Sequence, residues 1–253
     1  MIRSETRSRV ARIELARPEK KNAITAEMYV MLADALAAAE ADAQVRAVLL
    51  HGAADCFTAG NDLADFLARP PQGEGSPTWK FFRVLPAMEK PVVAAVGGPA
   101  VGIGTTLLLH CDLVYATPGA RFQLPFVPLG IVPEFGSTLL LPMLAGYQRA
   151  AELLLLGQPF SAQKAQEAGI VTAIVPQESL LEEAAKAAAA LAALPSASVR
   201  LTKRLMKARH AQAVSATIAE EGRLFLERLA SPEAKEAMSA FLEKRKPDFS
   251  RFP

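Results

Sequence analysis

The stretch that decides the fold is Val92-Val-Ala-Ala-Val-Gly-Gly-Pro-Ala-Val-Gly-Ile-Gly-Thr-Thr-Leu107. It begins as a short apolar run, which predicts a buried strand, passes through a glycine-rich turn and then enters a helix. Phe57-Thr-Ala-Gly-Asn-Asp-Leu63 has the same form, because it follows the apolar run Ala47-Val-Leu-Leu-His51. Backbone N–H groups at the start of a helix lack partners within the helix and lie at its positive end. Two such junctions are suited to hold a developing negative charge on an oxygen atom.

Strand and helix patterns alternate through the first half of the chain. A period of two over residues 10–15 predicts a further strand. Between it and the run at 47–51, apolar residues recur at helical spacing over 25–41, with Thr25 as the N-cap. Short apolar strands that alternate with helices indicate an α/β layered core rather than a helical bundle.

From Glu178 onward the sequence becomes rich in alanine and amphipathic. The pattern predicts helices at Ser179–Leu194, Ser196–Ala208, Ala211–Arg228 and Pro232–Lys244. No fixed-period repeat or long polar linker separates this region from the rest. We therefore predict a core over residues 1–195 that is followed by a helical C-terminal region over residues 196–253.

Composition and charge exclude several classes of protein. Lys plus Arg number 28 and Asp plus Glu number 26, so no strong positive field favours nucleic acid or an anionic membrane. Cys56 and Cys111 form no C-x-x-C pattern, which argues against a disulfide framework or a zinc site. The start of the chain mixes both charges and does not resemble a secretory signal. We expect a cytoplasmic protein that binds no metal, no nucleic acid and no membrane.

A dinucleotide-binding fingerprint is the competing interpretation of the glycine-rich turn, since Gly102-Ile-Gly104 resembles its beginning. Leu107 occupies the position of the third glycine, which disfavours a nucleotide site. Tight turns that bind no ligand are a further alternative for both loops, since Gly60, Gly102 and Gly104 let the chain turn sharply.

Several motifs occur together in a characteristic order and spacing. They are Leu15-Ala-Arg-Pro-Glu-Lys-Lys-Asn-Ala-Ile24, Ala59-Gly-Asn-Asp62, Lys90-Pro-Val-Val-Ala-Ala-Val-Gly-Gly98, Cys111-Asp-Leu-Val-Tyr-Ala116, Ser161-Ala-Gln-Lys-Ala165, Gly169-Ile-Val171 and Phe241-Leu-Glu-Lys-Arg-Lys-Pro247. With these motifs the chain resembles the enoyl-CoA hydratase/isomerase (crotonase) superfamily over nearly its whole length. The resemblance implies a spiral core of repeated β-β-α units and a helical C-terminal region that forms homotrimers or hexamers (dimers of trimers). It also implies an acyl-CoA thioester as substrate, with no cofactor because coenzyme A is part of that substrate.

The resemblance further implies an oxyanion hole formed by the backbone N–H groups of Ala59 and Ile103. Position 103 is usually glycine in the family, but isoleucine serves equally if its φ is negative, because only the N–H is used. A thioester suits such a hole, because removal of its α-proton or addition at Cβ gives an enolate with its charge on oxygen.

The acid or base decides which reaction follows. Hydratases of the family carry two glutamates, whose positions fall here on Thr106 and Phe126. Neither residue activates water at neutral pH. Glu134 lies in Leu129-Gly-Ile-Val-Pro-Glu-Phe-Gly-Ser-Thr138, which resembles the Pro-Glu-x-x-Ser loop of the Δ3,Δ2-enoyl-CoA isomerase branch. A single carboxylate is sufficient to take a proton from C2 and return it to C4, so Glu134 is the predicted catalytic residue.

Two opposing effects act on the pKa of Glu134. Apolar neighbours raise it by desolvation, whereas a helix N-terminus lowers it, and the sequence does not give the balance. A solvated glutamate in the first turn of a helix is the alternative interpretation. The other readings of the whole chain are a hydratase with its acids elsewhere, a thioester hydrolase, or a non-catalytic relative that binds acyl-CoA or RNA.

The remaining site candidates follow from the family motifs. The predicted CoA- or acyl-binding residues are Lys20, Lys21, Ala23, Gly60, Asn61, Asp62, Leu63, Gly102, Phe126, Phe241 and Lys244. In relatives the positions of the lysines lie near the CoA nucleotide, and the last of them reaches a neighbouring subunit. A lysine ammonium suits a phosphate group as a point charge, although a solvated surface lysine is an equally good interpretation of each.

Overall fold

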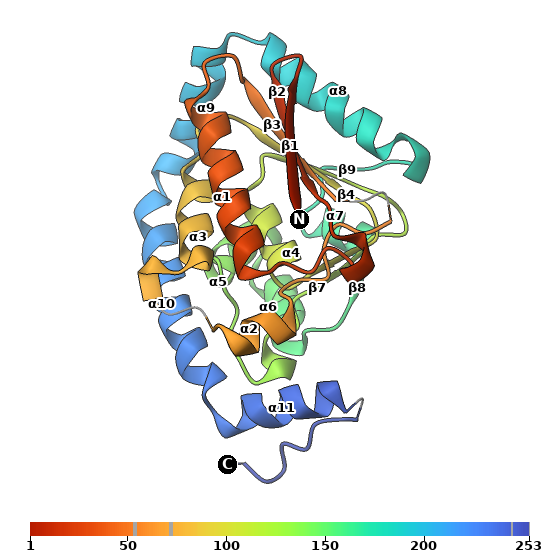
Figure 1. Ribbon diagram of the computed structural model, residues 1–253, viewed down its shortest axis with the longest axis vertical. Coiled ribbons are helices and arrows are strands. Elements are labelled where there is room, and N and C mark those ends of the chain that lie inside the picture. Colours follow the sequence, from red (N-terminus) through yellow and green to blue (C-terminus); the bar gives the residue numbers. More distant parts are fainter. Residues whose placement is uncertain (53–54, 71–72, 244, 253) are drawn as a thin grey trace.

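Two β-sheets form the centre of the part of the chain that the computed structural model describes, which is residues 1–52, 55–70, 73–243 and 245–252. The larger sheet has the strand order β1-β2-β3-β4-β6-β9, and the smaller has the order β5-β7-β8 (Figure 1). The strands are β1 Ile2–Arg7, β2 Val10–Leu15, β3 Ala47–His51, β4 Val92–Val96, β5 Pro99–Val101, β6 Leu113–Ala116, β7 Arg121–Gln123, β8 Phe160–Ser161 and β9 Ala173–Ile174. The fold is therefore mixed α/β, as the sequence predicts.

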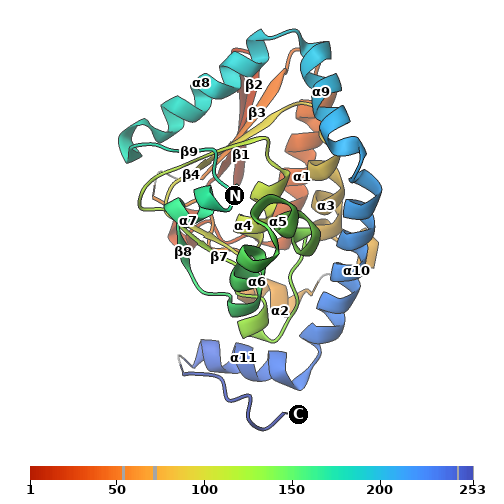
Figure 2. The same ribbon diagram turned by 180° about the vertical axis from the view of Figure 1, so that it is seen from behind.

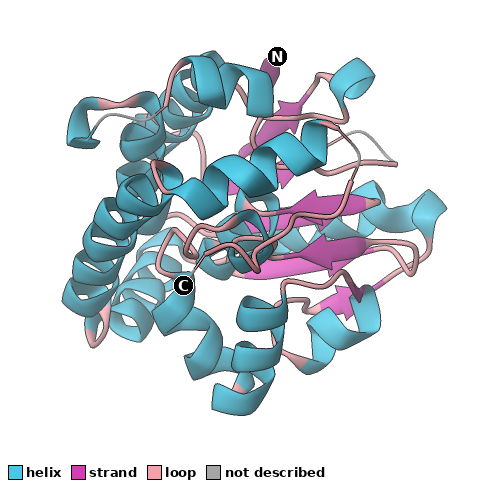
Figure 3. Cartoon of the chain, turned by 90° about the horizontal axis from the view of Figure 1, so that it is seen from below, coloured by secondary structure: helices cyan, strands magenta, loops and turns pink. Residues whose placement is uncertain are grey.

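Helices surround the sheets. The α-helices are α1 Ala26–Ala41, α2 Leu63–Ala68, α3 Pro77–Ala87, α4 Ile103–Thr106, α5 Ser137–Ala145, α6 Tyr147–Leu156, α7 Ala162–Glu167, α8 Leu180–Ala193, α9 Ser196–Ala208, α10 Ala211–Leu229 and α11 Pro232–Leu242. Short 3-10 turns are η1 Pro18–Lys20, η2 Gly73–Gly75, η3 Leu107–His110, η4 Val127–Leu129 and η5 Gln177–Ser179. Seen from below, the strands lie between helices (Figure 3).

The larger sheet is parallel except at its β1 edge, where β1 and β2 form an antiparallel hairpin. Parallel sheets bury both faces, which explains why β3 and β4 are almost continuously apolar. On one face, Ala184, Ala188 and Ala192 of α8 pack against Leu49 and Val93. The other face packs against α1 and α3 in the main core, as the two opposite views show (Figures 1 and 2).

Most of the predicted elements are confirmed. The strands expected at 10–15, 47–51 and 92–96 are β2, β3 and β4. Helix α1 begins after Thr25, whose side chain accepts a hydrogen bond from the N–H of Met28 at 3.3 Å. The smaller sheet was not predicted, because its strands are only two or three residues long and too short to show a period.

The C-terminal helices follow their predicted ranges closely. α9 and α10 run along one side of the molecule, and α11 crosses one end (Figure 1). α10 is part of the core, since Ile218 and Phe225 are buried in the main cluster and Gly222 lies against the ring of Trp79. The boundary at residue 195 stays a prediction. Among the described helices, none combines the length and apolar character that crossing a bilayer requires.

Candidate active site

The two glycine-rich loops lie side by side. The N–H of Thr58 donates to the carbonyl of Pro99 at 3.0 Å, and the N–H of Val101 donates to the carbonyl of Thr58 at 3.1 Å. Gly60 has φ of +92°, and a Cβ on it would lie 2.8 Å from the Val101 carbonyl oxygen. A Cβ on Gly104 would lie 2.6 Å from the Thr58 methyl group. Glycine at these two positions therefore allows the loops to approach.

The N–H groups of these loops are not equally available. The N–H of Ala59 donates to the carbonyl of Lys21 at 2.9 Å, so it is already satisfied inside the protein. The expectation that Ala59 supplies a donor to the oxyanion hole is therefore corrected. Within the described part of the chain, the N–H groups of Asn61 and Ile103 donate to no protein acceptor.

The register of the loops gives those two N–H groups corresponding positions. Thr58 pairs with Ala100 in a parallel bridge, and Asn61 and Ile103 each follow three residues later. Ile103 is the first residue of α4, where the N–H has no partner within the helix. The available donors of this site are therefore Asn61 and Ile103 rather than Ala59 and Ile103.

Glu134 lies in the loop between η4 and α5. Its side chain is buried, with the residue 5% exposed, and its Oε1 atom has no hydrogen-bond partner among the described residues. Burial, with a smaller contribution from the negative charge of Glu221, raises the pKa of Glu134 to about 8. The alternative of a solvated first-turn glutamate is therefore wrong. The helix that follows begins only at Ser137, after Glu134, and desolvation is the largest cause of the shift in its pKa.

The residue after Glu134 has an unusual backbone conformation. Phe135 has φ of 63°, in the left-handed region that costs a non-glycine residue roughly 1 to 2 kcal/mol. Its ring stacks on Phe82 with the ring centroids 4.1 Å apart, and its carbonyl accepts a hydrogen bond from His110 Nε2 at 2.8 Å. Burial lowers the pKa of His110 to about 4, so the ring is neutral and Nε2 carries its proton. Packing thus holds the loop in this strained form.

Tyr29 of α1 is hydrogen-bonded to the first loop and is affected by the charge of Glu134, and the sequence analysis missed it. Its hydroxyl donates to Asn61 Oδ1 at 2.6 Å. Burial raises the pKa of Tyr29, and the charge of Glu134 raises it further, which places Glu134 close to this pair. The sequence carried a signal for it: Tyr29 follows Met28 on the apolar side of a predicted helix. A tyrosine that is buried there needs a hydrogen-bond partner for its hydroxyl.

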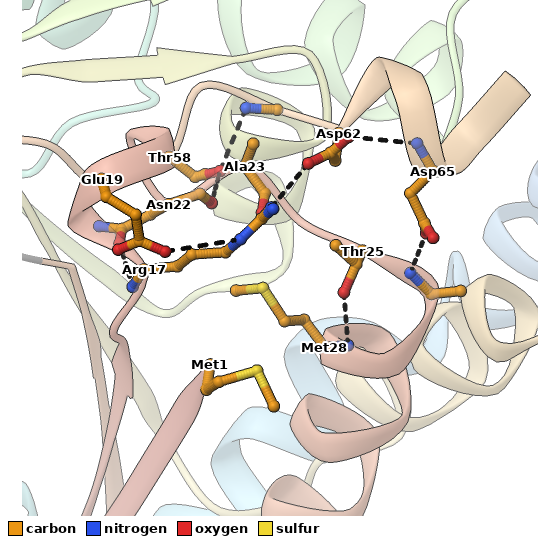
Figure 4. Close-up of polar contacts among 12 residues, drawn as sticks. Met1, Arg17, Glu19, Asn22, Ala23, Thr25, Met28, Thr58, Asp62 and Asp65 are labelled. Atoms are coloured by element: carbon orange, nitrogen blue, oxygen red, sulfur yellow. Dashed lines mark hydrogen bonds and ion pairs between the residues drawn. The ribbon is translucent and has the colours of Figure 1, made fainter.

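Asp62 has a structural role beside the first loop. Its carboxylate caps α2 by accepting from the N–H of Asp65 at 3.1 Å, and it pairs with Arg17 at 2.7 Å (Figure 4). Arg17 also donates to the carbonyl of Ala23 at 3.0 Å. The hydrogen bond from Arg17 holds the pKa of Asp62 below its usual value. Asp62 is thus an ionised cap that ties the segment at Ala23 to the loop.

The structure places the other candidates as follows. Lys20 and Lys21 are exposed on the η1 turn, and Gly102 precedes α4 with φ of 55°. Leu63 begins α2. Thr106 and Phe126 are buried, and neither is an acid.

Two candidates lie outside this group. Phe241, on α11, is 59% exposed, and no hydrogen bond among the described residues joins it to the loops. Lys244 lies outside the described residues.

A large apolar cavity is lined in part by two residues that contact Phe135. It has a volume of about 620 Å³ and is lined by residues of α3, η3, α5, α9 and α10. Phe82 and His110, which contact Phe135, are among them. Its lining includes neither Glu134 nor Asn61 nor Ile103, so it is not the cavity that these candidate groups line.

Comparison with known proteins gives consistent matches. The family model described as Enoyl-CoA hydratase/isomerase matches residues 5–251. The chain is 37% identical to 1,2-epoxyphenylacetyl-CoA isomerase of Escherichia coli K12, covering 98% of both chains. It is 35% identical to 2,3-dehydroadipyl-CoA hydratase of the same strain, covering 95% of both. A solved enoyl-CoA hydratase/isomerase from Pseudoalteromonas atlantica T6c superimposes with a TM-score of 0.94 at 42% identity, covering 98% of this chain and 99% of that one.

Proposed function

Because the chain belongs to the enoyl-CoA hydratase/isomerase family, we propose that it is an isomerase that moves the double bond of a 3-enoyl-CoA to position 2. The observation that carries the proposal is the buried carboxylate of Glu134, whose Oε1 has no hydrogen-bond partner among the described residues and whose pKa is raised to about 8 by burial and by the charge of Glu221. A general base works best when its pKa is near the working pH. The two positions that carry acids in hydratases hold Thr106 and Phe126.

The proposed reaction needs one group that moves a proton and one site that holds negative charge. Ionised Glu134 takes a proton from C2, and the electron pair delocalises through the C3–C4 double bond and onto the thioester oxygen. The N–H groups of Asn61 and Ile103 hold that oxygen, and loss of one such donor typically raises a barrier by about 3 to 4 kcal/mol. Glu134 then returns the proton to C4, which leaves the double bond between C2 and C3 and regenerates the carboxylate.

The hydratase reading is the second candidate, because several of the similar proteins are named as hydratases. Hydration adds water, so it requires a group that positions and activates a water molecule as well as the oxyanion hole. A thioester hydrolase has the same requirement. An apolar surrounding that leaves Glu134 Oε1 without a partner suits transfer of a proton within a bound acyl chain better than activation of water.

The rest of the proposal concerns binding and assembly. The exposed side chains of Lys20 and Lys21 would meet the phosphates of coenzyme A, and no other cofactor takes part.

Leu205 and Met206 on α9 are 71% and 73% exposed, and Tyr147 on α6 is 73% exposed. Such apolar surface supports a homotrimer or hexamer. A cytoplasmic location stays a prediction.

The test is to incubate the wild type and Glu134→Gln with 3-enoyl-CoA and, separately, with 2-enoyl-CoA, and to follow the products by liquid chromatography coupled to mass spectrometry, because the two positional isomers have the same mass and must be separated before detection. Isomerisation of the 3-enoyl substrate without a change of mass, lost in the variant, is the expected result. Glu220→Gln is the matched control, since Glu220 is an exposed glutamate of α10. Addition of water to the 2-enoyl substrate by both the wild type and Glu134→Gln would establish the hydratase reading instead.

A further inference from the structure

Glu221 lies far from Glu134 in the sequence, but it is bound to the loop that carries it. It is on α10 and is only 5% exposed. Its carboxylate accepts three hydrogen bonds: from the N–H of Gly136 at 2.5 Å, from the N–H of Thr138 at 2.9 Å and from the hydroxyl of Thr138 at 2.6 Å. All three donors follow Glu134 within four residues.

These contacts replace the missing N-cap of α5. The N-cap residue of that helix is Gly136, which has no side chain to accept a hydrogen bond. The first N–H groups of a helix need acceptors, and a negative charge at that end is favourable. Glu221 supplies both from a different helix.

The same contacts fix a segment that is otherwise poorly determined. Phe135 and Gly136 both have positive φ, with values of 63° and 74°. A left-handed pair between Glu134 and α5 sets the direction of the Glu134 side chain, and Phe135 is held by its ring and its carbonyl. Gly136 has no side chain to pack; its carbonyl accepts a hydrogen bond from the N–H of Leu140 at 2.9 Å within α5, and its N–H is held by Glu221.

We propose that Glu221 is a positioning residue for Glu134, which it keeps aimed at the reacting carbons by binding Gly136 and Thr138. This inference rests on the proposed function. Glu221 also affects the proton transfer through its charge, since a neighbouring carboxylate disfavours ionisation of Glu134. Among the described residues, the charge of Glu221 on α10 raises the pKa of Glu134, and the charge of Glu134 in turn raises the pKa of Tyr29 on α1.

The experiment compares Glu221→Gln with Glu220→Gln, its exposed neighbour on the same helix. An amide of the same shape keeps one acceptor oxygen but turns an N–H group toward donors that need an acceptor. We expect the plateau of kcat at high pH to fall about 10- to 100-fold, because a displacement of about 1 Å is enough for such a loss. KM should change less than about threefold. Glu220→Gln should match the wild type.

A second readout separates positioning from general damage. Glu221→Gln removes a negative charge near Glu134, so the pH at which kcat reaches half of its plateau should move to lower values. A merely structural role would not move it. Thr138→Val, which removes only the hydroxyl donor, should lower kcat less than Glu221→Gln does. The loss of kcat in the double variant should be smaller than the combined losses of the two single variants, because both substitutions remove the same hydrogen bond between Thr138 and Glu221.

The outcomes are distinguishable from failure of the proposed function. If the wild type does not isomerise 3-enoyl-CoA, the proposed function is wrong, and this inference with it. If the wild type is active and Glu134→Gln is inactive, but Glu221→Gln keeps the wild-type kcat and pH profile, only the positioning role is overturned. Binding of a saturated acyl-CoA, measured by calorimetry, identifies a variant that has lost its fold. If Glu221→Gln has lost its fold, Thr138→Val tests the positioning role in its place. Wild-type kinetics in Thr138→Val would then overturn the positioning role of Glu221.

Discussion

Replacing Glu134 with glutamine should abolish the reaction and at the same time stabilise the fold, by an amount that depends on pH. The carboxyl of Glu134 is buried, and its pKa rises from 4.5 to about 8. One pKa unit corresponds to roughly 1.4 kcal/mol, so ionising Glu134 costs about 5 kcal/mol more in the folded protein than in the unfolded chain. Glutamine has nearly the same shape and does not ionise.

The sign follows from proton binding. A group whose pKa is raised in the folded state contributes fully to stability below the unfolded pKa, and that contribution is lost as the pH rises through the folded pKa. For Glu134 the loss runs between about pH 4.5 and pH 8. Integration over this range gives a penalty in the wild type of about 1 kcal/mol at about pH 5 and about 3 kcal/mol at about pH 7. It approaches about 5 kcal/mol above about pH 9.

The assay is chemical denaturation of the wild type and Glu134→Gln at several pH values across that range, at one protein concentration. The free energy of unfolding of the variant should exceed that of the wild type by an increasing amount as the pH rises. Glu220→Gln serves as control, because Glu220 is exposed and should show no such rise. A difference that is independent of pH, or a variant less stable than the wild type at about pH 8, would refute a buried carboxyl with a raised pKa.

Three further predictions concern other parts of the molecule. The kcat/KM of the wild type for 3-enoyl-CoA should rise with pH, reach half of its plateau near about pH 8 and level off roughly one pH unit higher, because Glu134 acts as a base and must be ionised. Measurement of product after fixed reaction times at each pH checks this. Asp62→Asn keeps an acceptor for the α2 cap but loses the charge that pairs with Arg17, so its free energy of unfolding should fall by about 1 kcal/mol. Asp62→Ala loses both contacts and should lower the free energy of unfolding by about 2 to 3 kcal/mol. Chemical denaturation measures both values, and equal losses would contradict this. Lys203 is buried and pairs with Asp112 at 2.6 Å. Lys203→Ala should therefore lower the free energy of unfolding by about 3 kcal/mol, measured by chemical denaturation. A loss below about 1 kcal/mol would contradict the burial of that pair.

The sequence by itself determined the layered core and the parts that enter the site. Apolar runs of five residues at 47–51 and 92–96 are too short for buried helices, and each is followed by a glycine-rich turn. Local chemistry of this kind is sufficient to predict β3, β4, α1 and its cap at Thr25. The same reasoning identified Glu134, because its loop resembles a motif of the family.

Only the tertiary structure decided which groups of the site are available. The N–H of Ala59 is satisfied by the carbonyl of Lys21, a contact between segments that lie far apart in the chain, so the available donor moves to Asn61. The pKa of Glu134 depends on how completely the packed chain excludes water and on the charge of Glu221, which lies on a helix far away in the sequence. Local sequence encodes turns and periods, whereas burial and partnership arise between segments that meet only after folding.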